Sequence, residues 1–379
     1  PGGLRSPAGS GAGAVSDDTR IVGADVRPYR LRLSDTYRSS QVERTDREGW
    51  LLRLEARDGT EGWGEAAPLP GRTEDHDAAG RALEAAGGAL GDGPAPPDRL
   101  RSALPDDAPA AAHAVGLALD DLEARRSGEA LATRWARERG NGAPLGRVEV
   151  NATLPMERPE EMAARARAAV DRGFRCLKIK VGDSATRDLH RLTAVRREVG
   201  PEPSLRLDAN GAWTRREARS RLLRLEPYGI EYVEQPLPPD DLEGLGLLRE
   251  ETGTGVRVAA DESASTPDRV RTLVEKGLVD VVVLKPCVLG APERTLEAAR
   301  AAGRHGVDVV FTTCLGAAVE RAGALQLAAA GGGEPQPPCG LATGELLDED
   351  VVPAPAGPDG GALAVPLDRP GLGLTPGGA

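Results

Sequence analysis

Short apolar segments alternate with charged, helix-periodic stretches from residue 147 onward. The charged gaps include Glu160–Arg172 and Arg215–Leu225, which follow a helical repeat. Eight such strand–helix units in about 200 residues favour a closed parallel barrel over an open sheet. The pattern therefore predicts an α/β fold with a (β/α)8 TIM-type barrel over residues 147–345, although Gly331–Pro338 before the last strand is loop-like. The predicted strands are Val148–Leu154, Cys176–Val181, Ser204–Asp208, Ile230–Glu234, Val256–Asp261, Val279–Lys285, Val307–Thr313 and Cys339–Thr343.

The chain before the barrel has a different pattern. Alternating or apolar runs between Gly and Asp breaks predict an antiparallel meander, and two helical repeats follow it. These segments are Arg27–Ser34, Gly49–Ala56, Glu61–Glu65, Thr73–Ala86 and Ala108–Arg126. We therefore expect an α+β capping domain over residues 20–140. The polar segment Asp35–Ser40 predicts a mobile loop, and residues 1–19, rich in Gly, Ala and Ser, are expected to form a disordered leader.

Composition narrows the classes of partner. The formal net charge of −11 argues against nucleic acid and against an anionic membrane surface. No apolar run approaches the roughly 18 residues that a membrane span needs, so no span is expected. The cysteines Cys176, Cys287, Cys314 and Cys339 have no CxxC spacing. A reduced, cytoplasmic setting is the simplest interpretation.

Lysine is rare in this chain. Only Lys178, Lys180, Lys276 and Lys285 are lysines among the 48 basic residues. Lys178 and Lys180 share one face of their predicted strand. Two crowded ammonium groups lower each other's pKa, which predicts a general base; arginine stays protonated and cannot serve. The alternative is a pair of solvated lysines on an exposed strand.

Polar residues end the successive barrel strands. Asp208, Glu234, Asp261 and Lys285 each close an apolar run, at spacings of about one strand–helix unit. In such a barrel these side chains meet at the carboxyl-terminal face. Three unpaired carboxylates would repel one another, so a hard divalent cation is predicted there, and Mg²⁺ is favoured over Zn²⁺ because the set has no His or Cys. With flanking lysines, the site suits removal of a proton α to a carboxylate.

Each strand-end residue also has a simpler interpretation. Asp208 is placed to cap a turn or helix, and Lys285 precedes a proline and fits a solvated loop. Glu231 competes with Glu234 as a ligand, but it starts its strand. Glu262 is a candidate to support a neighbouring ligand. That all of these alternatives hold together at barrel spacing is improbable, so we retain the metal site with lysines.

These residues stand in segments that resemble the enolase superfamily, muconate-cycloisomerase-like subgroup. The resemblance spans nearly the whole chain from about Arg20. It implies an N-terminal cap over a modified barrel, with residues 346–379 returning to the cap. It also implies that Asp208, Glu234 and Asp261 bind Mg²⁺, with Mn²⁺ as an alternative ion, and that Lys180 and Lys285 flank the substrate. The matching segments are Lys178-Ile179-Lys180, Leu207-Asp208-Ala209-Asn210, Val233-Glu234-Gln235-Pro236, Ala260-Asp261-Glu262-Ser263 and Leu284-Lys285-Pro286.

Within this subgroup the chain is most similar to o-succinylbenzoate synthases of menaquinone biosynthesis. Gly62–Gly71 is similar to their cap signature, and Thr312-Thr313-Cys314 stands where many members have a Ser-rich run. The resemblance implies syn-dehydration of 2-succinyl-6-hydroxy-2,4-cyclohexadiene-1-carboxylate through an enediolate. Lys180 would be the base, Lys178 would stabilise charge and Lys285 would lie opposite the ring. The implied substrate contacts are Arg206, Asn210, Thr312, Thr313, Gly340 and Leu341.

The same strand ends fit other reactions. An N-acylamino acid racemase, a dipeptide epimerase or a muconate-type cycloisomerase would use the same lysines. A non-catalytic binding module is a further alternative, disfavoured by the intact metal and lysine positions. An acid-sugar dehydratase is disfavoured because no histidine ends a predicted strand. We expect a small-molecule carboxylate as partner, leave a homo-oligomer open, and expect the cap loop near Thr36–Arg47 to select the reaction.

Overall fold

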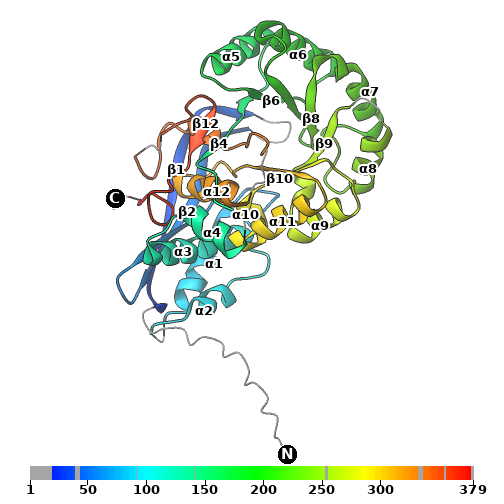
Figure 1. Ribbon diagram of the computed structural model, residues 1–379. Helices are drawn as coiled ribbons and strands as arrows, with labels where there is room; N and C mark the ends of the chain where they lie inside the picture. Colours follow the sequence, from blue (N-terminus) through cyan, green and yellow to red (C-terminus); the bar gives the residue numbers. More distant parts are fainter. Residues whose placement is uncertain are drawn as a thin grey trace, which may run out of the picture.

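The protein consists of an antiparallel sheet with its own helices and a curved parallel sheet ringed by further helices (Figure 1). It is seen in a computed structural model that describes residues 19–38, 43–91, 93–140, 142–251, 255–331, 336–353 and 356–376. Residues 1–18 of the predicted leader lie outside these ranges. The arrangement confirms the predicted fold class, a barrel with an α+β cap.

The cap sheet has the order β1-β2-β3, built from β1 (Ile21–Arg38), β2 (Glu43–Ala56) and β3 (Glu61–Ala66). Helix α3 lies directly on β3, because a Cβ atom at Gly64 would come within 1.9 Å of the carbonyl oxygen of Ala114. The meander and two of the helices were expected from the sequence; α2 and α4 were not. The helices are α1 (His76–Gly88), α2 (Pro97–Ser102), α3 (Pro109–Ser127) and α4 (Leu131–Glu138).

The loop predicted at Asp35–Ser40 is wrong in its first part. Strand β1 continues to Arg38, which pairs with Glu43, and Tyr37 pairs with Arg44. A register shift between Arg32 and Tyr37 takes up the extra residues of this polar segment. Backbone pairing with β2 holds the segment extended although its side chains are polar. Ser39 and Ser40 lie outside the described residues.

The parallel sheet has seven strands in the order β11-β10-β9-β8-β7-β6-β5. The bounds of β7, β8 and α7 coincide with those predicted. The strands are β5 (Ala152–Leu154), β6 (Cys176–Lys180), β7 (Ser204–Asp208), β8 (Ile230–Glu234), β9 (Arg257–Ala260), β10 (Val281–Leu284) and β11 (Asp308–Phe311). Between and after them lie α5 (Pro159–Asp171), α6 (Ala185–Val199), α7 (Arg215–Leu225), η2 (Glu226–Tyr228), α8 (Leu242–Glu251), η3 (Glu262–Ala264), α9 (Pro267–Glu275), α10 (Pro286–Leu289), α11 (Pro292–Arg304) and α12 (Ala318–Gly331).

The barrel closes through a very short eighth segment. Cys339 forms a parallel bridge with Val150, and Gly340 forms one with Thr312. The strand predicted at Cys339–Thr343 is therefore reduced to these bridges, because the chain turns into the 3-10 helix η4 (Ala342–Leu346). The strand predicted at Val148–Leu154 is split: β4 (Arg147–Glu149) pairs with β12 (Ala362–Ala364), and only β5 joins the barrel.

The C-terminal segment lies against the cap helices. The backbone N–H of Leu131 donates to Gly371 O (3.0 Å), and that of Leu372 donates to Asp121 Oδ1 (2.7 Å). Arg125 of α3 donates to the carbonyl oxygen of Leu374. These bonds tie the end of the chain to α3 and the start of α4.

Buried side chains fill both sides of the parallel sheet. Inside the barrel, Tyr232, Ala259, Val281, Val283 and Val310 form a cluster separate from the larger core between sheet and helices. These side chains fill the barrel interior below the strand ends, so the polar side chains at the carboxyl-terminal face lie on a packed apolar layer. Across the described ranges, no helix combines the length and apolarity needed to cross a bilayer.

Candidate active site

Lys180, Asp208 and Glu234 stand side by side at the ends of β6, β7 and β8. The strand register pairs Lys180 with Asp208 and Asp208 with Glu234. Lys178 lies one layer deeper on the same face of β6. The side chains of Lys178 and Lys180 are only 15% and 6% exposed. The structure thus brings these strand-end residues together in a buried group.

The Lys178 ammonium lies between two carboxylates. Its Nζ atom is 2.6 Å from Glu234 Oε1 and 3.0 Å from Asp208 Oδ2. Burial disfavours this charge, but attraction by Asp208 and Glu234 outweighs burial and holds the pKa of Lys178 well above its usual value. The prediction that Lys178 and Lys180 lower each other's pKa is therefore wrong for Lys178, because carboxylates surround it.

Lys180 and Lys285 approach from different parts of the barrel. Lys180 Nζ donates to Asp208 Oδ2 (2.7 Å) and Asn210 Oδ1 (2.9 Å). Lys285 follows β10, and its Nζ lies 2.7 and 2.5 Å from the two carboxylate oxygens of Asp261. The intervening strands β7, β8 and β9 separate β6 from β10. The two ammonium groups therefore face the centre of the barrel mouth from separate walls.

The three strand-end carboxyl groups differ in proton affinity. Burial raises the pKa of Asp208, but Lys178 and Lys180 more than reverse this and bring that pKa far below its usual range. Burial also opposes ionisation of Asp261, whose pKa is nevertheless held well down by Arg72 and Lys285. Burial, with repulsion from Asp208, raises the pKa of Glu234 to about 7. Of the three carboxyl groups, Glu234 is thus the one whose pKa is raised by burial and by repulsion from its neighbours.

The donor set fits a hard divalent cation. Asp208, Glu234 and Asp261 offer only oxygen atoms, which Mg²⁺ prefers. Oε2 of Glu234 is buried and lacks a hydrogen-bond partner in the structure. Within the described ranges no group of three His, Cys, Asp or Glu side chains is arranged as a ready metal site; the carboxylates instead hold ammonium groups. The three carboxylates are suited to bind a divalent cation, and in the structure they form ion pairs with lysines.

Strained backbone gathers at these strand ends. In the part of the chain that the structure describes, the non-glycine residues with positive φ are Asn210 (45°), Gln235 (40°) and Leu315 (60°). Such strain persists only where surrounding contacts hold the backbone in place. The side chain of the fully buried Gln235 makes two of these contacts, because its Oε1 accepts hydrogen bonds from the N–H groups of Asp261 (3.1 Å) and Ser263 (3.0 Å). Gln235 thereby fixes the end of β9 beside that of β8.

A cavity of about 200 Å³ opens above this group, and its walls include Lys178, Lys180, Lys285, Asp208 and Asp261. The predicted substrate contacts that also line it are Asn210, Thr312, Thr313 and Gly340. These four residues therefore lie where a substrate in the cavity could contact them, and their roles as substrate contacts stay predictions.

Two predicted substrate contacts lie elsewhere. Arg206 is fully buried one layer below Asp208, where it pairs with Glu231 (2.8 Å) and stacks over the ring of Tyr232. This ion pair occupies both side chains. Arg206 is therefore used in packing, and Glu231, which the sequence left as an alternative metal ligand to Glu234, is used to balance the charge of Arg206. Leu341 is 3% exposed and belongs to the apolar core. Neither Arg206 nor Leu341 lines the cavity as described, since each is used in packing.

Cap residues that sequence reasoning missed complete the cavity. Arg72 donates to Asp261 Oδ1 (3.0 Å), and Arg47 donates to the carbonyl oxygen of Cys314 (3.1 Å). Arg72 directly follows the cap segment Gly62–Gly71, and Arg47 ends the segment Thr36–Arg47 that the sequence marks as selective. The position of Arg72 and Arg47 next to these two segments was the signal available in the sequence. Only the packing of the cap on the barrel shows which arginines reach the cavity.

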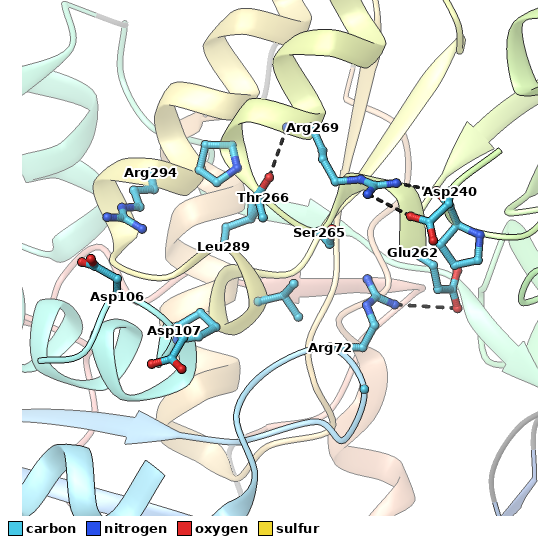
Figure 2. A pocket seen from close by; sticks show the side chains of 15 residues that line it. Arg72, Asp106, Asp107, Asp240, Glu262, Ser265, Thr266, Arg269, Leu289 and Arg294 are labelled. Carbon is cyan, nitrogen blue, oxygen red and sulfur yellow. Dashed lines mark hydrogen bonds and ion pairs between the residues drawn. The ribbon is translucent and has the colours of Figure 1, made fainter. Parts of the chain in front are cut away.

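A second cleft adjoins the cavity, with a volume of about 520 Å³ (Figure 2). Arg72 and Glu262 line both spaces, and their charged groups are 3.7 Å apart. Arg269 pairs with Asp240 beside Glu262, as Figure 2 shows. The Arg72–Glu262 pair therefore stands between the barrel mouth and the outer cleft.

Comparison with known proteins places this geometry in a family. Residues 161–378 match the family described as Enolase C-terminal domain-like. The chain belongs to the enolase superfamily. The dipeptide epimerase of Enterococcus faecalis, in complex with Mg and the dipeptide L-Leu-L-Tyr, has a similar fold, with a TM-score of 0.83 at 27% identity over 93% of this chain and 99% of that one. This confirms the family resemblance and the fold expected from the sequence.

Relatives within the superfamily differ in their reactions. An o-succinylbenzoate synthase from Thermobifida fusca is 38% identical over 61% of this chain and 70% of its own length. An L-Ala-D/L-Glu epimerase from Clostridium acetobutylicum is 31% identical over 69% of this chain and 70% of its own. A superfamily enzyme of the lyase or epimerase kind is therefore indicated.

Proposed function

We propose that this superfamily member is a magnesium-dependent lyase that removes water from 2-succinyl-6-hydroxy-2,4-cyclohexadiene-1-carboxylate, as an o-succinylbenzoate synthase does. The charge of the cavity supports this proposal. Each carboxylate among the described residues that line it already lies 2.5–3.7 Å from a cationic side chain, although Oε2 of Glu262 lacks a hydrogen-bond partner, so the lining offers the α-ammonium group of a dipeptide no acid without a cation. An anionic substrate without an ammonium group is favoured for that reason. The carboxylates and the cations that they face are Asp208 with Lys180, Asp261 with Lys285, and Glu262 with Arg72.

Asp208, Glu234 and Asp261 are the residues that would hold Mg²⁺. When bound, the ion would supply Lewis-acid stabilisation of negative charge on the substrate carboxylate. Asp208 Oδ2 also lies 2.7 Å from Lys180 Nζ, so this carboxylate positions the proposed base beside the site that the ion would occupy.

Lys180 is the proposed general base and then the general acid. Neutral Lys180 Nζ takes the proton from the carbon next to the carboxylate, and the electron pair of that C–H bond passes into the enediolate. The C–O bond to the hydroxyl group then breaks, a ring double bond forms, and Lys180 returns the proton so that water leaves. The side chains of Lys178 and Lys285 stabilise the developing negative charge.

Epimerisation is the second candidate. Lys180 and Lys285 stand on separate walls of the cavity, so one could remove an α-proton from one face while the other returns a proton to the opposite face. The dipeptide epimerases among the relatives also support this reading. The charge of the cavity favours N-acylated amino acids over free dipeptides as substrates of such a reaction.

A parallel assay separates the two reactions. The protein with Mg²⁺ is incubated with the cyclohexadiene carboxylate, followed by ultraviolet absorbance, and with N-succinyl amino acids and dipeptides, followed by optical rotation and by deuterium uptake from D₂O. We expect absorbance change at the highest kcat/KM, and its loss on chelation of the metal. Epimerisation of a dipeptide at a higher kcat/KM than dehydration would refute the proposal.

A further inference from the structure

Arg47 is a buried cation of the cavity that the proposed reaction leaves unused. It comes from β2 of the cap, is 2% exposed, and lines the same cavity as Lys180 and Lys285. We propose that Arg47 binds a second carboxylate, at the end of the substrate away from the reacting carbon, and so selects dicarboxylates. This inference rests on the proposed function for the identity of the reaction, and it concerns the opposite end of the substrate.

The guanidinium of Arg47 is only partly satisfied. Its Nε donates to Cys314 O (3.1 Å) and its Nη1 donates to Glu48 O (2.8 Å). Nη2 is buried and has no hydrogen-bond partner in the structure. An unpaired buried charge is costly, and a guanidinium edge matches a carboxylate in two parallel hydrogen bonds. Arg47 is thus held in place by backbone oxygens with donor capacity to spare.

The two buried acids near Arg47, Glu65 and Glu320, form no ion pair with it. Glu65 accepts hydrogen bonds from Tyr29 Oη (2.5 Å), Ala317 N (2.6 Å) and Glu320 N (2.8 Å). Glu320 Oε1 accepts from Cys314 N (3.0 Å), its Oε2 has no hydrogen-bond partner, and burial raises its pKa well above the usual value although Arg47 acts in the opposite direction. Across the described ranges no carboxylate forms an ion pair with Arg47, so a carboxylate from a ligand would be its natural counterion.

The position of Arg47 suits the far end of a substrate. It contacts Cys314, just beyond β11, whereas Asp208 ends β7. The sheet order, with the Cys339–Gly340 segment as eighth member, puts β11 and β7 four positions apart in a ring of eight, on opposite sides of the mouth. A ligand whose first carboxylate lies over Asp208 would have to extend across the cavity to reach Arg47.

Part of the cavity lining is uncharged, beside the charged groups at the strand ends. Leu33, Leu69, Leu315 and Leu346 contribute apolar surface. Thr313 and Thr343 also line the cavity, and their hydroxyl groups hydrogen-bond each other at 2.9 Å. A ligand with an apolar body and a carboxylate at each end therefore matches a cavity whose lining combines these apolar side chains with Arg47 and the strand-end lysines.

Equilibrium binding of two ligands tests the inference. The dicarboxylate o-succinylbenzoate is compared with 2-butanoylbenzoate, in which a methyl group replaces the distal carboxylate, by calorimetry with the Mg²⁺-loaded protein. We expect Arg47→Met to weaken the dicarboxylate about 10- to 100-fold and to change binding of the monocarboxylate less than about threefold. Arg47→Lys should fall between these limits, since it keeps the charge but loses the planar fork.

The comparison between ligands removes the effect of any structural damage. Arg53→Gln is the matched control, because Arg53 lies on the same strand and pairs with Glu61 outside the cavity. Equal weakening of both ligands by Arg47→Met, or none, overturns the inference. Wild-type protein that dehydrates the cyclohexadiene substrate without this Arg47-dependent preference refutes the inference alone. Protein that keeps the preference but does not dehydrate refutes the proposed reaction alone.

Discussion

Replacement of Lys180 by arginine tests the proposed base while keeping its charge. Lys180 Nζ is 2.7 Å from Asp208 Oδ2, and a guanidinium there can keep this ion pair. It cannot lose its proton at any accessible pH. The larger side chain must fit at a position only 6% exposed, which costs on the order of 1–3 kcal/mol of folding stability by overpacking.

The expected loss of turnover is much larger than this structural effect would produce. General-base catalysis contributes about 10²- to 10⁴-fold, or roughly 3–5 kcal/mol of transition-state stabilisation. The positive charge opposite the carboxylates remains, so substrate binding should change little. Lys180→Arg should therefore lower kcat by at least about 100-fold while KM stays within a few-fold of wild type.

The assay is dehydration followed by ultraviolet absorbance, with circular dichroism and thermal unfolding to verify the fold. Lys276→Arg is the matched control, because Lys276 is an exposed lysine at the end of α9 and should tolerate the change. A folded Lys180→Arg protein that turns over within about threefold of wild type would eliminate Lys180 as the base.

Three further predictions concern the fold that supports the site. Burial lowers the pKa of His113 to about 4, so below pH 6.5 the unfolded chain binds more protons than the folded protein. Acidification to pH 5 should therefore lower the free energy of unfolding by about 2 kcal/mol, a loss that the His113→Gln variant should not show; urea unfolding at pH 5 and 7.5 measures it. Arg206→Met should destabilise the protein by about 3 kcal/mol, by removing the ion pair with Glu231, without weakening substrate binding; an increase in KM alone would contradict this. Gly64→Ala should lower the melting temperature by several degrees, since its methyl group meets α3; an unchanged melting temperature would contradict the packing.

Much of the barrel could be predicted because its strands are local apolar runs. Ser204–Asp208 and Ile230–Glu234 end where a carboxylate follows buried residues, and the structure ends β7 and β8 at the same positions. The eighth strand could not be bounded in this way. Cys339 and Gly340 count as barrel members only through bridges to Val150 and Thr312, which are distant in the chain.

The sequence by itself determined the fold class and the ends of β7 and β8. It could do so because the spacing of apolar residues along the chain and the topology of parallel barrels are sufficient for these features. Only the tertiary structure decided the electrostatics. Carboxylates from β7 and β8 surround Lys178 and raise its pKa, whereas its neighbour Lys180 alone suggested the opposite. Tertiary packing also decided which arginines enter the cavity, because Arg47 and Arg72 reach it from the cap, and no local sequence pattern encodes how the cap packs on the barrel.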